Sequence, residues 1–322
     1  MIGSAPDGRV ASTPCLASVS NDREAPEVLW RPSNYNFRVV VGTSAYLFNA
    51  VTGALLRLSR EEDAIVANIL QKSNASRYSE LRDLVGRRSL AALRRGGFLI
   101  RSDFDEVDYL RIRSQVKRFS GDGLYLAVCP TMECNFRCVY CYEADGTRST
   151  GKRLTMDDET IQSLVAFVAL KADSVRRVGI VWYGGEPALA LGTIAKITSR
   201  LRKILEKTRA QYQGYMITNG YEVTRDKLKL LRELGIGGVQ VTLDGCRTIH
   251  DRRRPHVSGA GTFDRIIENL TWLKEQLAVT IRINLDKENL ESVPHLLEYL
   301  TSAGFRNSRV LVTLARVNPH EG

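Results

Sequence analysis

Apolar and polar residues alternate in two different patterns along the chain, and the pattern changes near residue 120. In the first part, three short apolar stretches lie between residues 36 and 58, separated by Gly42-Thr43-Ser44 and Val51-Thr52-Gly53. Short apolar runs divided by turn residues are typical of antiparallel strands. The pattern therefore predicts a small antiparallel sheet at this end of the chain.

Helical spacing follows the predicted sheet. Ser59 and Glu62 stand three residues apart, which is the spacing of a capping box at the start of a helix. Two more short helices are predicted over residues 79–84 and 89–93. Residues 28–105 are therefore expected to form a small α+β domain of winged-helix-like order, with three strands before three helices.

Beyond a charged linker helix predicted over residues 106–119, buried-type strands alternate with amphipathic helices. Repeated units of this kind build a parallel sheet with right-handed crossovers, here a partial (β/α)6 barrel over residues 120–322. The fold class is therefore α/β, with the chemistry expected at the carboxyl ends of the strands. The predicted strands are 124–128, 178–183, 214–218, 238–243, 279–285 and 309–314, and the predicted helices 156–170, 191–205, 225–234, 262–277 and 290–303.

The composition is that of a folded globular chain. Of 322 residues, 43% are hydrophobic and 25% are charged, which excludes wholesale disorder. No apolar run approaches the roughly 20 residues that span a bilayer. Residues 1–27 have the composition of a disordered tail and lack the pattern of a secretory signal. We therefore expect a cytoplasmic protein with no membrane partner.

The net charge of +10 permits an acidic peptide or a nucleic acid as partner. The sequence contains no recognisable RNA-binding module and no basic stripe rich in aromatic residues. Nucleic acid is therefore not the partner that we expect.

Three of the six cysteines stand close together, directly after the first predicted barrel strand. Cys134, Cys138 and Cys141 have the spacing C-x3-C-x2-C. Three thiolates suit a soft metal or an iron–sulfur cluster. A structural zinc normally takes a fourth protein ligand, and no second pair of close ligands follows. The pattern favours an iron–sulfur cluster.

With the aromatic Tyr140 before its last cysteine, this motif resembles that of the radical S-adenosylmethionine (SAM) superfamily. The resemblance implies that Cys134, Cys138 and Cys141 bind three irons of a [4Fe–4S] cluster, and that SAM chelates the fourth. It also implies that one electron, from a flavodoxin- or ferredoxin-like donor, cleaves SAM. The resulting 5′-deoxyadenosyl radical then abstracts a hydrogen atom from the substrate.

Two further motifs stand where the resemblance places SAM contacts. Gly184-Gly185-Glu186-Pro187 ends the second predicted strand, where the family binds the amino group of SAM. Its glycines allow close approach of the backbone to a ligand. Thr218-Asn219 ends the third strand, at a position that contacts SAM in the family. Read alone, both motifs are also ordinary turn sequences.

The fourth strand ends in a longer signature. Thr242 and Asp244 are followed by His250, Asp251 and Arg254, which resembles the pattern of the peptide- and protein-modifying branch that includes anaerobic sulfatase maturases. The resemblance implies that Thr242 and Asp244 bind the ribose of SAM or line the substrate pocket. His250 and Asp251 are expected to be structural rather than catalytic.

In the fifth strand, Arg282 and Asn284 alternate with apolar residues and therefore share one face. An arginine facing the interior of a parallel sheet is costly unless it is paired. We expect Arg282 to pair with the SAM carboxylate through its planar fork. A salt bridge with a buried carboxylate of the protein is the alternative.

The order of residues 28–105 resembles the leader-peptide recognition domain of ribosomal-peptide maturases. Such a domain adds an extended peptide to the edge of its sheet. A cap that merely packs on the barrel is the alternative. The branch usually continues into a cysteine-rich extension with auxiliary clusters, but no cysteine follows Cys246. Either the chain is a fragment, the extension is a separate polypeptide, or the enzyme works with one cluster.

The leading hypothesis is thus a radical SAM enzyme that modifies or cross-links a ribosomally synthesised precursor peptide. A second hypothesis keeps the chemistry but gives it a protein substrate, as in sulfatase maturation, or an RNA. A third is a non-catalytic leader-binding or scaffold subunit, or a truncated enzyme.

Overall fold

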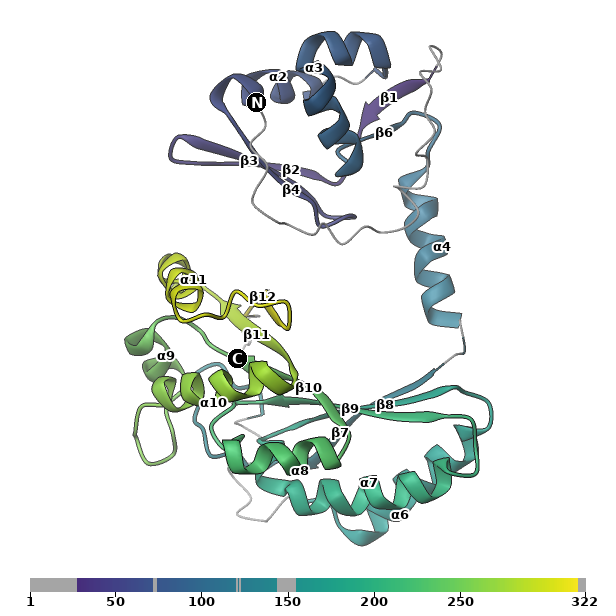
Figure 1. The fold of residues 1–322 in the computed structure, drawn as a ribbon, viewed down its shortest axis with the longest axis vertical. Helices are drawn as coiled ribbons and strands as arrows, with labels where there is room; N and C mark the ends of the chain where they lie inside the picture. The colour runs from purple at the N-terminus through teal and green to yellow at the C-terminus, as the bar shows by residue number, and fades with distance from the viewer. Residues whose placement is uncertain (1–27, 72–73, 120, 122, 144–154, 318–322) are drawn as a thin grey trace. The chain divides into compact units, whose positions relative to one another are not determined.

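The computed structural model describes residues 28–71, 74–119, 121, 123–143 and 155–317 (Figure 1). The chain divides into two compact units, residues 1–119 and 120–322. The tail predicted over residues 1–27 lies outside the described residues.

The first unit contains the predicted antiparallel sheet. Strand β3 (Ser44–Asn49) pairs with β2 (Asn36–Val41) on one side and β4 (Leu55–Leu58) on the other. Helix α2 (Arg60–Gln71) begins at the predicted capping box. The Ser59 backbone N–H donates to the Glu62 carboxylate at 2.9 Å, and the Glu62 N–H donates to Ser59 Oγ at 3.2 Å.

The next helix, α3 (Tyr78–Arg95), is broken at Gly86, whose φ of +76° is not helical. Glycine takes this backbone conformation without strain, so the chain can break the helix here. The two short helices predicted for this range are thus confirmed. Helix α4 (Glu106–Phe119) occupies the range predicted for a linker helix. The winged-helix resemblance of this unit stays a prediction.

A second small sheet in this unit was not predicted. Strand β1 (Leu29–Pro32) lies between β5 (Ser76–Arg77) and β6 (Leu99–Arg101) and is antiparallel to both. Strands of two to four residues are too short to display an alternating pattern, and a proline in β1 further masks it.

The second unit is built on a six-stranded parallel sheet, as predicted. Its strand order is β12-β11-β10-β9-β8-β7, so each strand lies beside its neighbour in the sequence. This is the arrangement of a partial barrel. The strands are β7 (Gly123–Thr131), β8 (Arg177–Gly184), β9 (Gln211–Thr218), β10 (Ile236–Thr242), β11 (Ala278–Leu285) and β12 (Val310–Arg316).

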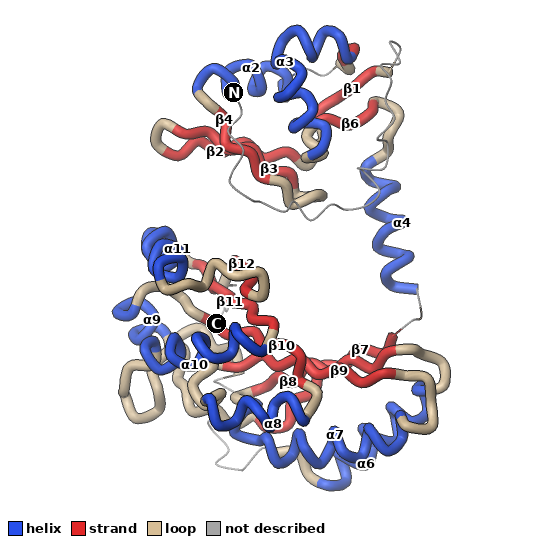
Figure 2. The backbone as a smooth tube through the Cα atoms, viewed as in Figure 1, coloured by secondary structure: helices blue, strands red, loops and turns tan. Residues whose placement is uncertain are grey.

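Helices connect these strands, and Figure 2 shows α6, α7 and α8 along the same side of the sheet. One of them, α9 (Arg247–Arg253), was not predicted. Among the described residues, no helix is both long and apolar enough to cross a membrane. The other helices of this unit are α6 (Asp158–Ala172), α7 (Leu191–Leu205), α8 (Leu228–Glu233), α10 (Phe263–Gln276) and α11 (Val293–Ser302). Three short 3-10 turns accompany them: η1 (Pro187–Ala190), η2 (Arg225–Lys227) and η3 (Leu290–Ser292).

Alternation along the strands separates the core from the site. In β11, Ile281 and Ile283 are fully buried in the core that the helices cover. Arg282 and Asn284 point to the opposite face and are only partly buried. The predicted common face of these two polar residues is therefore confirmed, and it is the face that the helices leave free.

Candidate functional site

The three clustered cysteines lie in the loop that follows β7. Cys134, Cys138 and Cys141 are free thiols, each partly buried. The backbone N–H of Phe136 points at the Cys134 sulfur, 3.4 Å away. Burial raises the pKa of the Cys134 thiol to about 11, so only a bound cation or metal would hold it as a thiolate near neutral pH.

The donor set fits an iron–sulfur cluster. No three cysteine, histidine or carboxylate side chains in the described part of the chain converge as ligands of a single metal ion would. A four-iron cluster presents its irons at separate corners, so each thiolate binds its own iron. Asn135 Nδ2 and Arg254 Nε are buried beside this loop without an acceptor among the described residues. Cluster sulfides and SAM would supply acceptors for both donors.

The glycine motif, Gly184-Gly185-Glu186-Pro187 at the end of β8, contacts the cysteine loop on one side. The Gly185 N–H donates to the Thr131 carbonyl at 3.1 Å, and the Glu186 N–H donates to the Glu133 carbonyl at 2.8 Å. A Cβ added at Gly185 would lie 2.3 Å from the Glu133 carbonyl oxygen. Gly185 is thus required because two loops of the protein pack together here. The sequence had instead suggested that glycine lets the backbone approach a ligand. Contact of Gly184 and Gly185 with SAM stays a prediction.

Gly185→Ala is expected to destabilise the second unit by about 1–3 kcal/mol, because the new Cβ would meet backbone atoms that have no room to move. Gly192→Ala in α7 is the matched control, since a Cβ there meets nothing within 4 Å. That control is expected to be neutral or to stabilise by up to about 1 kcal/mol. Urea unfolding of the two variants measures the difference, and equal free energies of unfolding would contradict this account of Gly185.

Glu186 joins the ends of β8 and β9. Its side chain is fully buried and accepts hydrogen bonds from Thr218 Oγ1 (2.6 Å), the Asn219 N–H (2.6 Å) and the Ala188 N–H (2.9 Å). Burial raises the pKa of Glu186, and these three donors oppose that effect. Pro187, also buried, begins the short turn η1 that the Glu186 side chain caps. The structure therefore brings two motifs that are 32 residues apart into contact.

The cysteine loop is also tied to β9. Asn219 Nδ2 donates to Asn135 Oδ1 at 2.7 Å, and the ring of Tyr221 packs edge-on against that of Phe136 with centroids 5.7 Å apart. Asn135 was not singled out from the sequence. Its only sequence signal is its place directly after the first cysteine of the triad.

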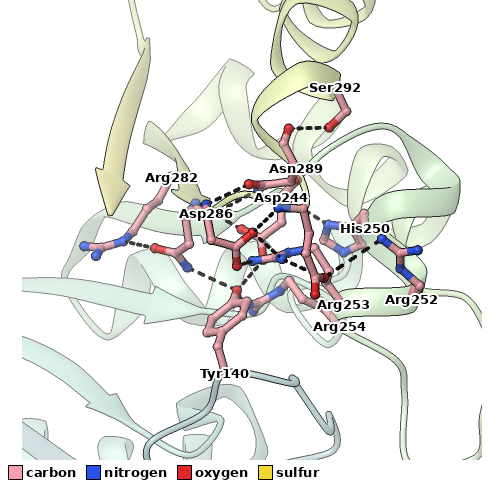
Figure 3. A network of polar contacts seen from close by, with 12 residues as sticks. Tyr140, Asp244, His250, Arg252, Arg253, Arg254, Arg282, Asp286, Asn289 and Ser292 are labelled. Carbon is pink, nitrogen blue, oxygen red and sulfur yellow. Dashed lines mark hydrogen bonds and ion pairs between the residues drawn. The ribbon is translucent and has the colours of Figure 1, made fainter. Parts of the chain in front are cut away.

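Tyr140 and Asp244 lie at the centre of a buried polar network (Figure 3). The Tyr140 hydroxyl donates to the Asp244 carboxylate and accepts from Arg254 (2.6 Å) and Asn284 Nδ2 (3.1 Å). The Asn284 backbone N–H donates to the other Asp244 oxygen at 3.0 Å. Arg253, not singled out from the sequence, forms two hydrogen bonds with Asp286 and lies 3.8 Å from Asp244.

Both Asp244 carboxylate oxygens thus have partners within the protein, and burial raises the pKa of Tyr140. Asn289 completes the arrangement by donating to the main-chain carbonyls of Asp244 and Asn284, each at 2.7 Å. This network positions the last cysteine of the loop, which follows Tyr140. A ribose contact by Asp244 stays a prediction.

Arg282 and Thr242 lie side by side on β11 and β10. Arg282 Nε donates to Asn284 Oδ1 at 2.7 Å, and Figure 3 shows the tip of its guanidinium pointing away from the Asp244 network. Within the described ranges Arg282 forms no ion pair with a carboxylate. A SAM carboxylate as its partner stays a prediction.

His250 and Asp251 are held by structural contacts. His250 is fully buried on α9, and its Nδ1 accepts from the Asp244 N–H at 3.2 Å. Asp251 accepts from the N–H groups of Thr262 (2.7 Å) and Phe263 (2.8 Å) and so caps α10. These contacts agree with the expectation that both residues are structural.

His250 gives the fold a pH dependence. Burial lowers the pKa of His250 well below its usual value, so the folded state holds it neutral while the unfolded chain takes up a proton below about pH 6.5. Between pH 7.5 and 5.5, the free energy of unfolding of the wild type should therefore fall by about 1.4 kcal/mol more than that of His250→Asn. Exposed His295 provides the control variant His295→Asn. Urea unfolding at both pH values decides, and parallel losses in wild type and His250→Asn would refute the assignment.

The sequence profile of the Radical SAM superfamily matches residues 128–300, more than half of the chain. Curated relatives include an Fe-coproporphyrin III synthase of Methanosarcina barkeri (26% identity, 60% of this chain and 45% of the relative) and a serine-type anaerobic sulfatase-maturating enzyme of Klebsiella aerogenes (25% identity, 54% and 42%). A GTP 3',8-cyclase of Rhodopseudomonas palustris is 29% identical to this chain, and the match covers 56% of this chain and 50% of the cyclase.

Among solved structures, anSMEcpe with bound AdoMet and the Kp18Cys peptide has a similar fold, with a TM-score of 0.52 and 23% identity. The match covers 61% of this chain and 52% of that one. The chain spans about half the length, or slightly less, of the curated relatives it matches. These relatives carry names of very different substrates, so their likeness alone assigns none.

Proposed function

Because the chain belongs to the radical SAM superfamily, we propose that Cys134, Cys138 and Cys141 bind a [4Fe–4S] cluster with SAM at its open iron. When bound, these cofactors supply reductive cleavage of SAM and a 5′-deoxyadenosyl radical. The observation that carries the proposal is the loop of three free thiols, held between the glycine motif and the Asp244 network. The protein fixes the cofactors and keeps water from the radical.

The residues divide into two roles in this proposal. Glu186, Tyr140 and Asp244 hold the site in shape, because their polar atoms are satisfied within the protein. The Glu186 carbonyl already accepts from the Leu189 N–H, so the backbone oxygens of Gly184 and Gly185 would accept from the SAM ammonium group. Arg282, on the face that the helices leave free, binds the SAM carboxylate through its fork. Thr218, Asn219, Thr242 and Asn284 complete the SAM contacts.

The test is formation of 5′-deoxyadenosine from SAM by the anaerobically reconstituted protein with dithionite as electron source. We expect 5′-deoxyadenosine even without substrate, and exposure of the reconstituted protein to air should abolish it. A normal cluster that never cleaves SAM would instead favour a non-catalytic leader-binding or scaffold subunit.

For the substrate, we propose a ribosomally synthesised precursor peptide that the first unit binds by strand addition. Relatives named as sulfatase-maturating enzymes and the peptide-bound solved structure support a peptide or protein substrate. Strand β2 supports the mode of binding, because it lies at the edge of its sheet and pairs only with β3 among the described strands. Unpaired edge strands invite another chain unless they are protected.

The outer face of β2 is unusually apolar for an exposed strand. Phe37, Val39 and Val41 alternate along it and are 54%, 52% and 62% exposed. Two more apolar side chains continue this face across the sheet: Phe48 on β3 is 39% exposed, and Leu55 on β4 is 63% exposed. An apolar strip beside free backbone groups offers an extended peptide both hydrogen bonds and side-chain contacts.

Fluorescein-labelled precursor peptides encoded beside the gene are the probes for this proposal, used with the full chain. We expect binding and a peptide mass change that depends on SAM. The double variant Val39→Lys, Val41→Lys should weaken binding at least about tenfold without altering substrate-free 5′-deoxyadenosine formation. Leu170→Lys, at a 77% exposed position of the second unit, is the control. Modification of a sulfatase-derived peptide or an RNA, with no effect on any precursor peptide, would overturn the proposal.

A further inference from the structure

The segment after α9 forms a short ladder with the cysteine loop. The Arg137 N–H donates to the Pro255 carbonyl at 2.9 Å, and the Val139 N–H donates to the Arg253 carbonyl at 3.0 Å. From the other direction, the Val257 N–H donates to the Asn135 carbonyl at 2.8 Å. Arg254 therefore sits on a strip of backbone that is paired to the loop on both sides of Cys138.

The Arg254 side chain lies against that loop. Its terminal nitrogen donates to the Tyr140 hydroxyl at 2.6 Å, and its guanidinium lies 5.8 Å from the centre of the Phe136 ring. Phe136 and Tyr140 flank Cys138 by two residues on either side, so the guanidinium passes beside this cysteine. It is also close enough for its charge to interact with the Cys134 and Cys138 thiols.

Arg254 is a buried cation that no carboxylate of the described residues contacts directly. The residue is only 8% exposed, and among the described residues it forms no ion pair, while its Nε has no acceptor. The neighbouring Arg253 shows the contrast, because it is 1% exposed but forms two hydrogen bonds with Asp286. Arg254 feels the charges of Asp244 and Glu186 without contacting either carboxylate directly. A buried charge without a directly paired counter-ion is unfavourable, so a negative group bound beside Arg254 would stabilise it.

We propose that Arg254 is the counter-ion of the thiolate-bound [4Fe–4S] cluster and a positioning residue that eases its reduction. The proposal rests on the function proposed above. Three thiolates and an oxidised cluster carry a net charge of about −1, and one added electron makes it about −2. A fixed cation beside the cluster stabilises the more negative state, and the low dielectric of a buried site strengthens this effect. Arg254 thereby favours the reduced form, which is the form that cleaves SAM.

The groups that face Arg254 from the surrounding elements are consistent with this role. The Tyr140 hydroxyl donates a hydrogen bond to Asp244, and burial raises the pKa of Tyr140. Asp244 has the positive charge of Arg253 within 3.8 Å. Glu186 is satisfied by its three donors. Arg254 thus forms no direct ion pair with either carboxylate, and the thiolates of a bound cluster would add negative charge beside it.

The test compares Arg254→Gln, which removes the charge, with Arg254→Lys, which keeps it. Arg252→Gln is the control, because Arg252 lies two residues earlier, on α9, and its side chain is 62% exposed. Each reconstituted protein is titrated with dithionite under EPR, and iron per chain is measured alongside. At a fixed potential, Arg254→Gln should lower the ratio of reduced to oxidised cluster about tenfold, a shift of about 59 mV to more negative potential. Arg254→Lys and Arg252→Gln should stay within about threefold of the wild type.

Each outcome decides between a charge role and a merely structural one. A normal cluster in Arg254→Gln with an unchanged midpoint potential overturns the proposal, as does an equal shift in Arg254→Lys. If Arg254→Gln takes up no iron, recovery of iron in Arg254→Lys supports it, and loss in both variants contradicts it. Absence of a cluster from the wild type is a separate result, since it refutes the proposed function itself.

Discussion

Replacing Cys134, Cys138 and Cys141 together by Ala is expected to abolish 5′-deoxyadenosine formation, a loss of roughly a thousandfold or more. The three thiols are the donors that the loop presents for a cluster. Without them the chain has no means to hold iron at this place. SAM cleavage requires the electron that the cluster delivers, so no residual pathway is expected. Liquid chromatography of the adenosine product and iron analysis of the purified protein are the measurements.

Cys129→Ala and Cys246→Ala are the matched controls for the triad. Both cysteines are free and partly buried like the triad, but they lie outside its loop. We expect both variants to keep iron and to form 5′-deoxyadenosine within about twofold of the wild type. Full iron content in the triple variant, or loss of iron in both controls, would assign the cluster to other residues.

Glu186→Leu is expected to have the largest effect on stability, about 3–5 kcal/mol, together with loss of measurable SAM binding. Leucine is close to glutamate in size but offers no acceptor, so three buried donors on Ala188, Thr218 and Asn219 would be left without partners. Those donors lie at the ends of β8 and β9, where the proposal places SAM. The damage therefore reaches both the fold and the cofactor site.

Urea unfolding and equilibrium dialysis with radiolabelled SAM measure the two effects of Glu186→Leu. Glu186→Gln keeps one side-chain oxygen and should lose less stability than the leucine variant. Glu233→Leu, at a 60% exposed position of α8, is the control and should stay within about 0.5 kcal/mol of the wild type. A Glu186→Leu protein of normal stability that still binds SAM would show that this carboxylate does not organise the site.

The barrel and its motifs were predictable because buried parallel strands appear in sequence as short apolar runs, and Glu186, Asn219 and Asp244 directly follow such runs. Helix α9 was not predicted, since its seven residues are mostly charged and have no apolar stripe. Alone among the residues of this helix, Arg253 is both charged and almost fully buried, and no local pattern distinguishes it from Arg252.

Partners distant along the chain were beyond sequence reasoning. Tyr140 and Asp244 are 104 residues apart, and only the tertiary fold brings the cysteine loop after β7 to the end of β10. The need for glycine at Gly185 comes from the carbonyl groups of residues 132 and 133, in the loop after the neighbouring strand β7. Spacing identifies which residue types stand at strand ends, but packing decides whether they face a ligand or one another.

EPR spectroscopy of the dithionite-reduced wild type, with and without SAM, tests most directly whether the loop holds a cluster with one open iron. The account predicts about four irons per chain and a reduced-cluster signal whose shape changes when SAM is added, because SAM would bind an iron that no cysteine occupies. A protein that holds a single zinc ion, or a cluster signal that SAM leaves unchanged, would contradict it.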